Sequence, residues 1–145
     1  RLAFWEQTLE AFTQSNCRLY DKITAGKDHW QAAGSGVSGM PYNLIFGKNE
    51  VRVEFSMQSA SAETNQKVFD YLLARKESIE ATFGAPLIWL PLPGRKACRI
   101  QFAQPVDGYN KDNWPTMTQW LIKHMTRLEQ ALSPYLEQVK PELRG

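Results

Sequence analysis

Apolar residues recur at helical spacing in three stretches of the chain. Over 2–14, every third or fourth residue is apolar and the rest are mostly polar, which predicts an amphipathic helix. A longer helix is predicted over 61–83, with capping signals at both ends. Asp112 is the expected N-cap of the last helix. Because proline lacks a backbone N–H, we expect this helix to kink or restart at 133–134 and to end at 141.

Strict alternation of apolar and polar residues marks the strands. It is clearest over 51–58, where valine, phenylalanine and methionine alternate with arginine, glutamate, serine and glutamine. One side of this strand is therefore expected in the core and the other in contact with water. Four further strands are predicted over 29–33, 42–46, 87–90 and 96–102.

The predicted element order is α-β-β-β-α-β-β-α. Strands joined by short hairpins favour an α+β domain, here a five-stranded, mainly antiparallel sheet with three helices packed on one face. The other face would carry Arg52, Glu54 and Arg99.

The composition fits one folded domain over residues 1–145. The chain is 43% hydrophobic with a net charge of only +2, which excludes a disordered tail and shows no overall preference for nucleic acid. It does not begin with Met, and the first amphipathic pattern is already under way at residue 1. We expect a domain excised from the C-terminal part of a longer protein; a trimmed terminus is the alternative.

Cysteine usage and hydropathy indicate the compartment. Cys17 and Cys98 are far apart and are expected to be thiols, with a single disulfide as the less favoured alternative. There is no signal peptide and no apolar run of the ~20 residues that span a bilayer. We therefore expect a cytoplasmic chain without a membrane partner.

The motifs of common enzymes are not present in this sequence. Residues 34–39 match G-x-G-x-x-G, but Met40-Pro41 and a strand follow instead of a helix, so a simple glycine turn is favoured over an anion-binding loop. His29 and His124 are distant and lack metal-ligand spacing. Glu54 has no lysine two residues on, as a metal-dependent nuclease would require. We expect no catalytic residue, no metal and no cofactor.

A set of cationic and aromatic residues in loops and on strands is the candidate site for DNA or another anion. Arginine and lysine contact phosphates, an exposed Trp30 can stack on a base, and His29 can donate a hydrogen bond. The alternative is a solvated sheet face with Trp30 in the core. The candidate residues are Lys27, His29, Trp30, Arg52, Glu54, Arg95, Lys96 and Arg99.

Several short segments together resemble a known family. They include Lys27-Asp28-His29-Trp30, Val51-Arg52-Val53-Glu54, Arg95-Lys96-Ala97-Cys98-Arg99-Ile100 and Trp114-Pro115. In this combination the chain resembles bacterial domain-of-unknown-function family 4268. The resemblance implies a DNA-related role, since family members often follow an N-terminal part that is similar to PD-(D/E)xK nucleases in restriction and phage-defence proteins.

These observations lead to three hypotheses. The first is a non-catalytic accessory domain for DNA binding or target recognition, linked to or associated with a nuclease domain. The second is a protein-interaction or dimerisation module, such as a homodimer formed through aromatic residues of the last helix (Trp114, Trp120). The third is a small-anion or nucleotide sensor that combines the glycine turn with Lys27 and Arg99.

Overall fold

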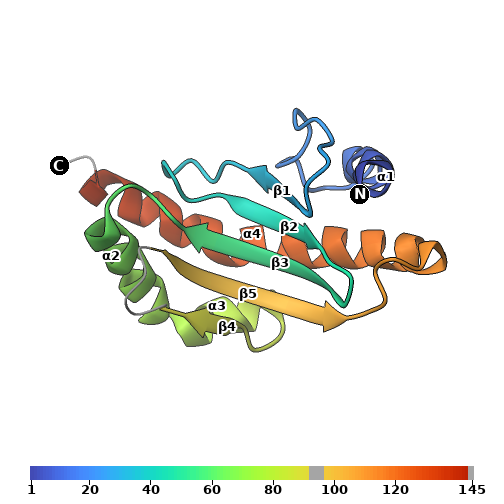
Figure 1. Cartoon of the computed structure of the whole chain (residues 1–145). Coiled ribbons are helices and arrows are strands. Elements are labelled where there is room, and N and C mark those ends of the chain that lie inside the picture. Colours follow the sequence, from blue (N-terminus) through green and yellow to red (C-terminus); the bar gives the residue numbers. More distant parts are fainter. Residues whose placement is uncertain (92–96, 144–145) are drawn as a thin grey trace.

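The computed structural model describes residues 1–91 and 97–143, and they form one antiparallel sheet with helices (Figure 1). The sheet has the strand order β1-β2-β3-β5-β4. All four strand pairs are antiparallel, which confirms the predicted α+β class. The elements are α1 (Leu2–Thr13), β1 (Trp30–Ala33), β2 (Tyr42–Phe46), β3 (Glu50–Met57), α2 (Ala62–Leu73), α3 (Lys76–Phe83), β4 (Ile88–Leu90), β5 (Cys98–Pro105), the 3₁₀ turn η1 (Lys111–Asn113) and α4 (Trp114–Leu143).

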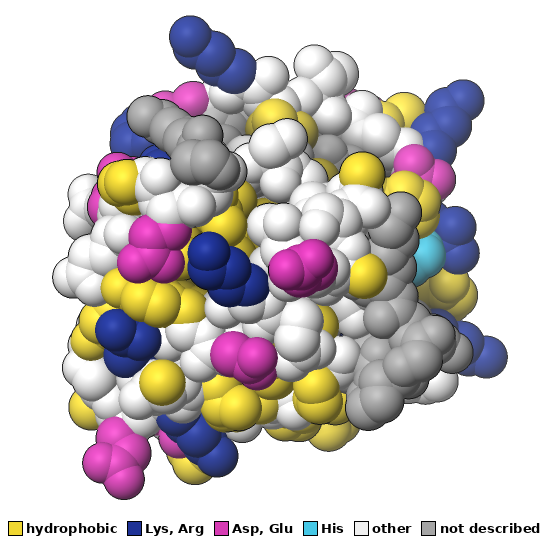
Figure 2. All heavy atoms as spheres, turned by 90° about the vertical axis from the view of Figure 1, so that its left-hand side faces the viewer, with side chains coloured by type: hydrophobic (Ala, Val, Ile, Leu, Met, Phe, Trp, Pro, Cys, Tyr) yellow, Lys and Arg dark blue, Asp and Glu magenta, His cyan; other side chains and the backbone are white. Residues whose placement is uncertain are grey.

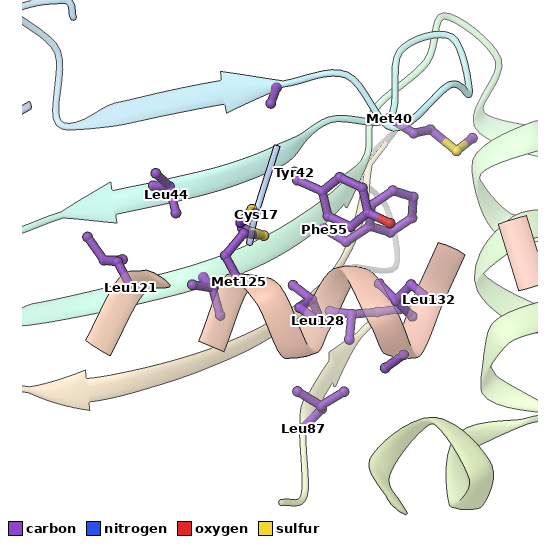
Figure 3. Close-up of a cluster of buried hydrophobic side chains, with 14 of the residues drawn as sticks. Cys17, Met40, Tyr42, Leu44, Phe55, Leu87, Leu121, Met125, Leu128 and Leu132 are labelled. Atoms are coloured by element: carbon purple, nitrogen blue, oxygen red, sulfur yellow. The ribbon is translucent and has the colours of Figure 1, made fainter. Parts of the chain in front are cut away.

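The core lies between one face of the sheet and the helices. Strand register places alternate residues of β2, β3 and β5 on the same side, where they are apolar and buried. The long α4 runs across this side of the sheet (Figure 1), and its buried leucine and methionine side chains point toward β2 and β3 (Figure 3). Both cysteines are buried free thiols, as the sequence predicts.

The predicted helix over 61–83 is wrong in one respect, because it divides into α2 and α3. The break lies at Arg75, whose guanidinium stacks on the Tyr71 ring at 3.6 Å and donates to the Tyr71 carbonyl oxygen. The Arg75 backbone N–H then donates to Leu72 instead of continuing the regular ladder. The chain therefore turns, α3 packs on α4, and the described residues form four α-helices in place of the predicted three.

The last helix also differs from its prediction at both ends. α4 continues through Pro134 and Pro141 to Leu143. Buried residues on either side of Pro134 hold this segment against the core, so packing outweighs the backbone hydrogen bond that proline cannot make. At the other end, Asp112 lies inside the 3₁₀ turn that precedes α4, and Asn110 caps this turn by accepting from the Asp112 N–H.

Glu80 ties α3 to the edge of the sheet. Its carboxylate accepts hydrogen bonds from the Leu87 N–H at 2.7 Å and from Trp89 Nε1 at 3.1 Å. Burial opposes charge at this carboxyl, but the two hydrogen bonds outweigh it and lower the pKa of Glu80.

His124 is part of an aromatic cluster on α4. Its ring lies 4.3 Å from that of Trp120 and 5.1 Å from that of Phe102, centroid to centroid. Burial lowers the pKa of His124, and the nearby Lys123 and Arg127 charges act in the same direction. This histidine is therefore a packed structural residue that stays neutral near neutral pH.

His124 makes stability pH-dependent. Its folded pKa is below the unfolded value of about 6.5, so the unfolded chain binds the extra proton first and stability falls as pH drops below that value. We expect His124→Phe, which keeps ring packing, to reduce the loss of melting temperature between about pH 7 and pH 5. Partial burial raises the pKa of the Glu129 carboxyl, which acts in the opposite direction, so only the difference in pH dependence between wild type and His124→Phe is diagnostic. An equal pH dependence of melting temperature in wild type and His124→Phe would contradict this contribution of His124.

A close backbone contact requires glycine at position 108. A Cβ there would collide with the carbonyl oxygen of Gly47, in the β2–β3 hairpin turn. We expect Gly108→Ala to destabilise the fold by about 1–3 kcal/mol, as overpacking does. Gly34→Ala is the matched control, because no atom lies within 4 Å of its Cβ position. Chemical denaturation measures the free energy of unfolding of both variants, and equal values for Gly108→Ala and Gly34→Ala would contradict the close contact.

Candidate functional site

The second face of the sheet gathers polar side chains instead of core residues. The helices meet the sheet through its apolar face, while cross-strand register aligns the outward residues of the other face in rows. One row runs Trp30–Ile45–Arg52, and the next runs Asn43–Glu54–Gln101. Ser56 and Arg99 oppose each other in a third row. We call these eight residues the open face.

A carboxylate lies at the centre of the open face. Glu54 is only 4% exposed, although its direct neighbours in the row, Asn43 and Gln101, are both polar. Its Oε2 accepts from Asn43 Nδ2 at 3.0 Å and from Ser56 Oγ at 2.9 Å. These neutral donors, which come from β2 and β3, compensate for the loss of water around the charge.

Two arginines flank this carboxylate. Arg52 donates through Nε to Glu54 Oε1 at 3.0 Å and through Nη1 to Glu50 Oε2 at 3.1 Å, so its guanidinium is held at both ends. Arg99 is held less firmly, because its Nε lies 3.9 Å from Glu54 Oε1. The Arg99 side chain is also more exposed than that of Arg52. Arg99 is therefore the cation of this face that is freer to reach a ligand.

Three buried polar atoms on this face have no hydrogen-bond partner among the described residues. They are Asn43 Oδ1, Gln101 Oε1 and Arg99 Nε. Buried polar groups are nearly always satisfied, and an unmet group indicates a ligand or an ordered water as its partner. Two acceptors and one donor are thus left around Glu54.

A shallow hollow of about 360 Å³ opens over this arrangement. His29 and Trp30 border it on the β1 side, with their rings edge to face at 5.0 Å, and Arg99 borders it on the β5 side. Trp30 is 43% exposed. The alternative that placed Trp30 in the core is therefore wrong.

Not all of the predicted site residues meet at this hollow. His29, Trp30, Arg52, Glu54 and Arg99 line it together. Lys27 is an exposed loop residue and does not line it. Arg95 and Lys96 lie outside the described residues.

Sequence reasoning missed three polar residues that complete the open face. Asn43, Ser56 and Gln101 were not among the candidates, although each lies on the outward side of a strand. A detectable signal existed for Asn43, which alternates with the apolar Tyr42 and Leu44 in an otherwise apolar strand. Its amide connects β2 to the Glu54 carboxylate, which no single strand pattern reveals.

The glycine turn lies elsewhere. Gly36 and Gly39 have the positive φ angles that favour glycine, and Gly36 lies against the ammonium of Lys140 rather than against Lys27 or Arg99. A separate hollow there is lined by the glycine turn, the start of α2 and the end of α4. On this side of the molecule, basic and acidic side chains are interspersed and form no patch of one sign (Figure 2).

The fold and the open face define a small α+β sheet domain with one polar, accessible face. The chain belongs to the family described as "Domain of unknown function (DUF4268)", whose family model matches residues 1–136. No curated protein and no solved structure matches the chain. Within the described residues, no helix combines the length and the apolarity needed to cross a membrane.

The central carboxylate should also be a determinant of stability. Glu54→Ala leaves Arg52, Asn43 and Ser56 facing an empty position, and we expect a loss of about 3–5 kcal/mol, as for other broken buried pairs. Glu50→Ala removes only the exposed partner of Arg52 and should cost about 1 kcal/mol or less. Urea denaturation of both variants tests this difference, and similar losses would show that Glu54 is no more important than a surface carboxylate.

Proposed function

We propose that this chain is a non-catalytic accessory domain that binds DNA through the open face of its sheet. The observation that carries the proposal is the arrangement of two arginines and an exposed tryptophan around one hollow. Guanidinium groups match phosphate oxygens, and an aromatic ring supplies a surface on which any base can stack. Arg99 contributes the more available charge, and Arg52 a firmly oriented one.

The setting of this activity follows from the family resemblance. We infer that the domain serves target recognition in a bacterial restriction or phage-defence protein, in the cytoplasm, alongside a linked or associated nuclease domain. The hollow supplies binding groups, and the cutting chemistry is assigned to the nuclease domain.

Fluorescence anisotropy with labelled duplex and single-stranded DNA tests the proposal. Binding should be detectable at low salt and should weaken between about 50 mM and 200 mM salt, since phosphate contacts release counterions. Arg52→Ala combined with Arg99→Ala should weaken binding and reduce the slope of log affinity against log salt by about 0.7–0.9 for each arginine–phosphate pair removed. Lys67→Ala, which removes an exposed cation of α2, is the control and should bind normally. Absence of binding at low salt, or a double variant with unchanged affinity, would overturn the proposal.

A protein-interaction module is the second candidate. Trp30 and Ile88, which are 43% and 49% exposed, lie on the outward side of the two edge strands and flank the open face with apolar surface. The expected patch of Trp114 and Trp120 does not support it, because both rings pack against other aromatic side chains. Light scattering distinguishes the two candidates, since a homodimer through this face would be broken by Ile88→Asp and left intact by Leu73→Asp on α2.

A further inference from the structure

The charge of the open face is balanced at its centre. Arg52 and Arg99 face Glu54, and Arg52 also contacts Glu50, so two cations are accompanied by two carboxylates. The outer surface of a DNA duplex carries phosphates, and these bind most tightly to a protein surface with an excess of positive charge. A duplex laid on this face would bring its phosphates toward the Glu54 carboxylate.

The groups at the centre suit the edge of a base better than a phosphate. Glu54, Asn43 Oδ1 and Gln101 Oε1 are acceptors, and the last two have no hydrogen-bond partner among the described residues. Asn43 is itself more than nine-tenths buried. Adenine, cytosine and guanine present amino N–H donors beside acceptor atoms, whereas a phosphate presents only acceptors. The unmet donor, Arg99 Nε, can serve the acceptor atom of such a base.

Trp30 and the hollow provide the complementary shape. The ring of Trp30 is exposed at the rim, and the hollow of about 360 Å³ is at the lower end of the range for small-ligand sites, roughly 300–1,000 Å³. Aromatic side chains bind unpaired bases by stacking, while arginines at the rim accompany the backbone. In a duplex, both faces of each base are already stacked.

We propose that the open face binds single-stranded DNA in preference to duplex, with a base stacked on Trp30 and its polar edge directed toward Glu54 and Asn43. This inference rests on the proposed function and specifies the form of DNA that the site takes. Arg99, which is only loosely paired with Glu54, keeps its unmet Nε toward the base edge and directs the end of its guanidinium to a backbone phosphate.

The first test compares labelled single strands of about 12 nucleotides, rich in cytosine or made of thymine alone, with a duplex of the same length. We expect the cytosine-rich strand to bind about ten-fold more tightly than the duplex, and more tightly than the thymine strand, whose bases lack an amino group. Trp30→Ala should weaken single-strand binding about five-fold or more, and Trp30→Phe should restore most of it. Tyr109→Ala removes another exposed aromatic ring that does not line the hollow, and it should have no effect.

Glu54→Gln provides a second test, in which duplex affinity and the base preference among single strands should change in opposite directions. Replacing the carboxylate by an amide removes a repulsive charge, so duplex affinity should rise, while the preference for cytosine over thymine should fall. Thermal melting confirms that this variant folds; if it does not, the Trp30 variants decide the question.

Duplex binding as tight as single-strand binding, or Trp30→Ala with unchanged affinity, would overturn the inference and leave the proposed function standing. Absence of binding to every DNA would overturn both.

Discussion

The packing of α4 against one face of the sheet is the constraint on which the rest of this structure depends. The helix has nine buried residues, and Leu121, Met125, Leu128 and Leu132 among them lie between α4 and the apolar side of the sheet (Figure 3). Burial of each large aliphatic side chain contributes about 1.5–3 kcal/mol, so this contact makes a large contribution to the folding free energy. It also determines the direction of every strand residue, because side chains alternate strictly and those that do not face α4 must face away from it.

This division of the sheet explains why an ionic network occurs on the opposite face. Once Val53 and Phe55 are buried toward α4, Glu54 between them can only point outward, into the middle of the second face. A carboxylate at so enclosed a position is tolerated because Asn43, Ser56 and Arg52 donate to it. The same network holds the Arg52 guanidinium at both ends and leaves Arg99 more loosely paired. The buried carboxylate and the side chains that compensate its charge thus form one group on the second face of the sheet.

The helices show where local patterns mislead. Apolar spacing runs without interruption through 61–83, yet the chain turns at Arg75, because an arginine that stacks on Tyr71 and binds its carbonyl competes with the helical ladder. At Pro134 and Pro141 the opposite occurs, and burial on both sides of Pro134 preserves a helix that local propensity would end. In both cases contacts outside the periodic pattern determine the outcome.

The sequence by itself determined the α+β class, the strands and the face on which Arg52, Glu54 and Arg99 lie, because alternation and helical spacing are local properties of the chain. Only the tertiary structure decided which of the candidate residues meet. It brought Asn43 and Gln101 beside Glu54 through cross-strand register, exposed Trp30 at the rim, and placed the glycine turn next to Lys140. These contacts join residues that are far apart in sequence. They depend on strand register and packing, and no local pattern specifies either of these.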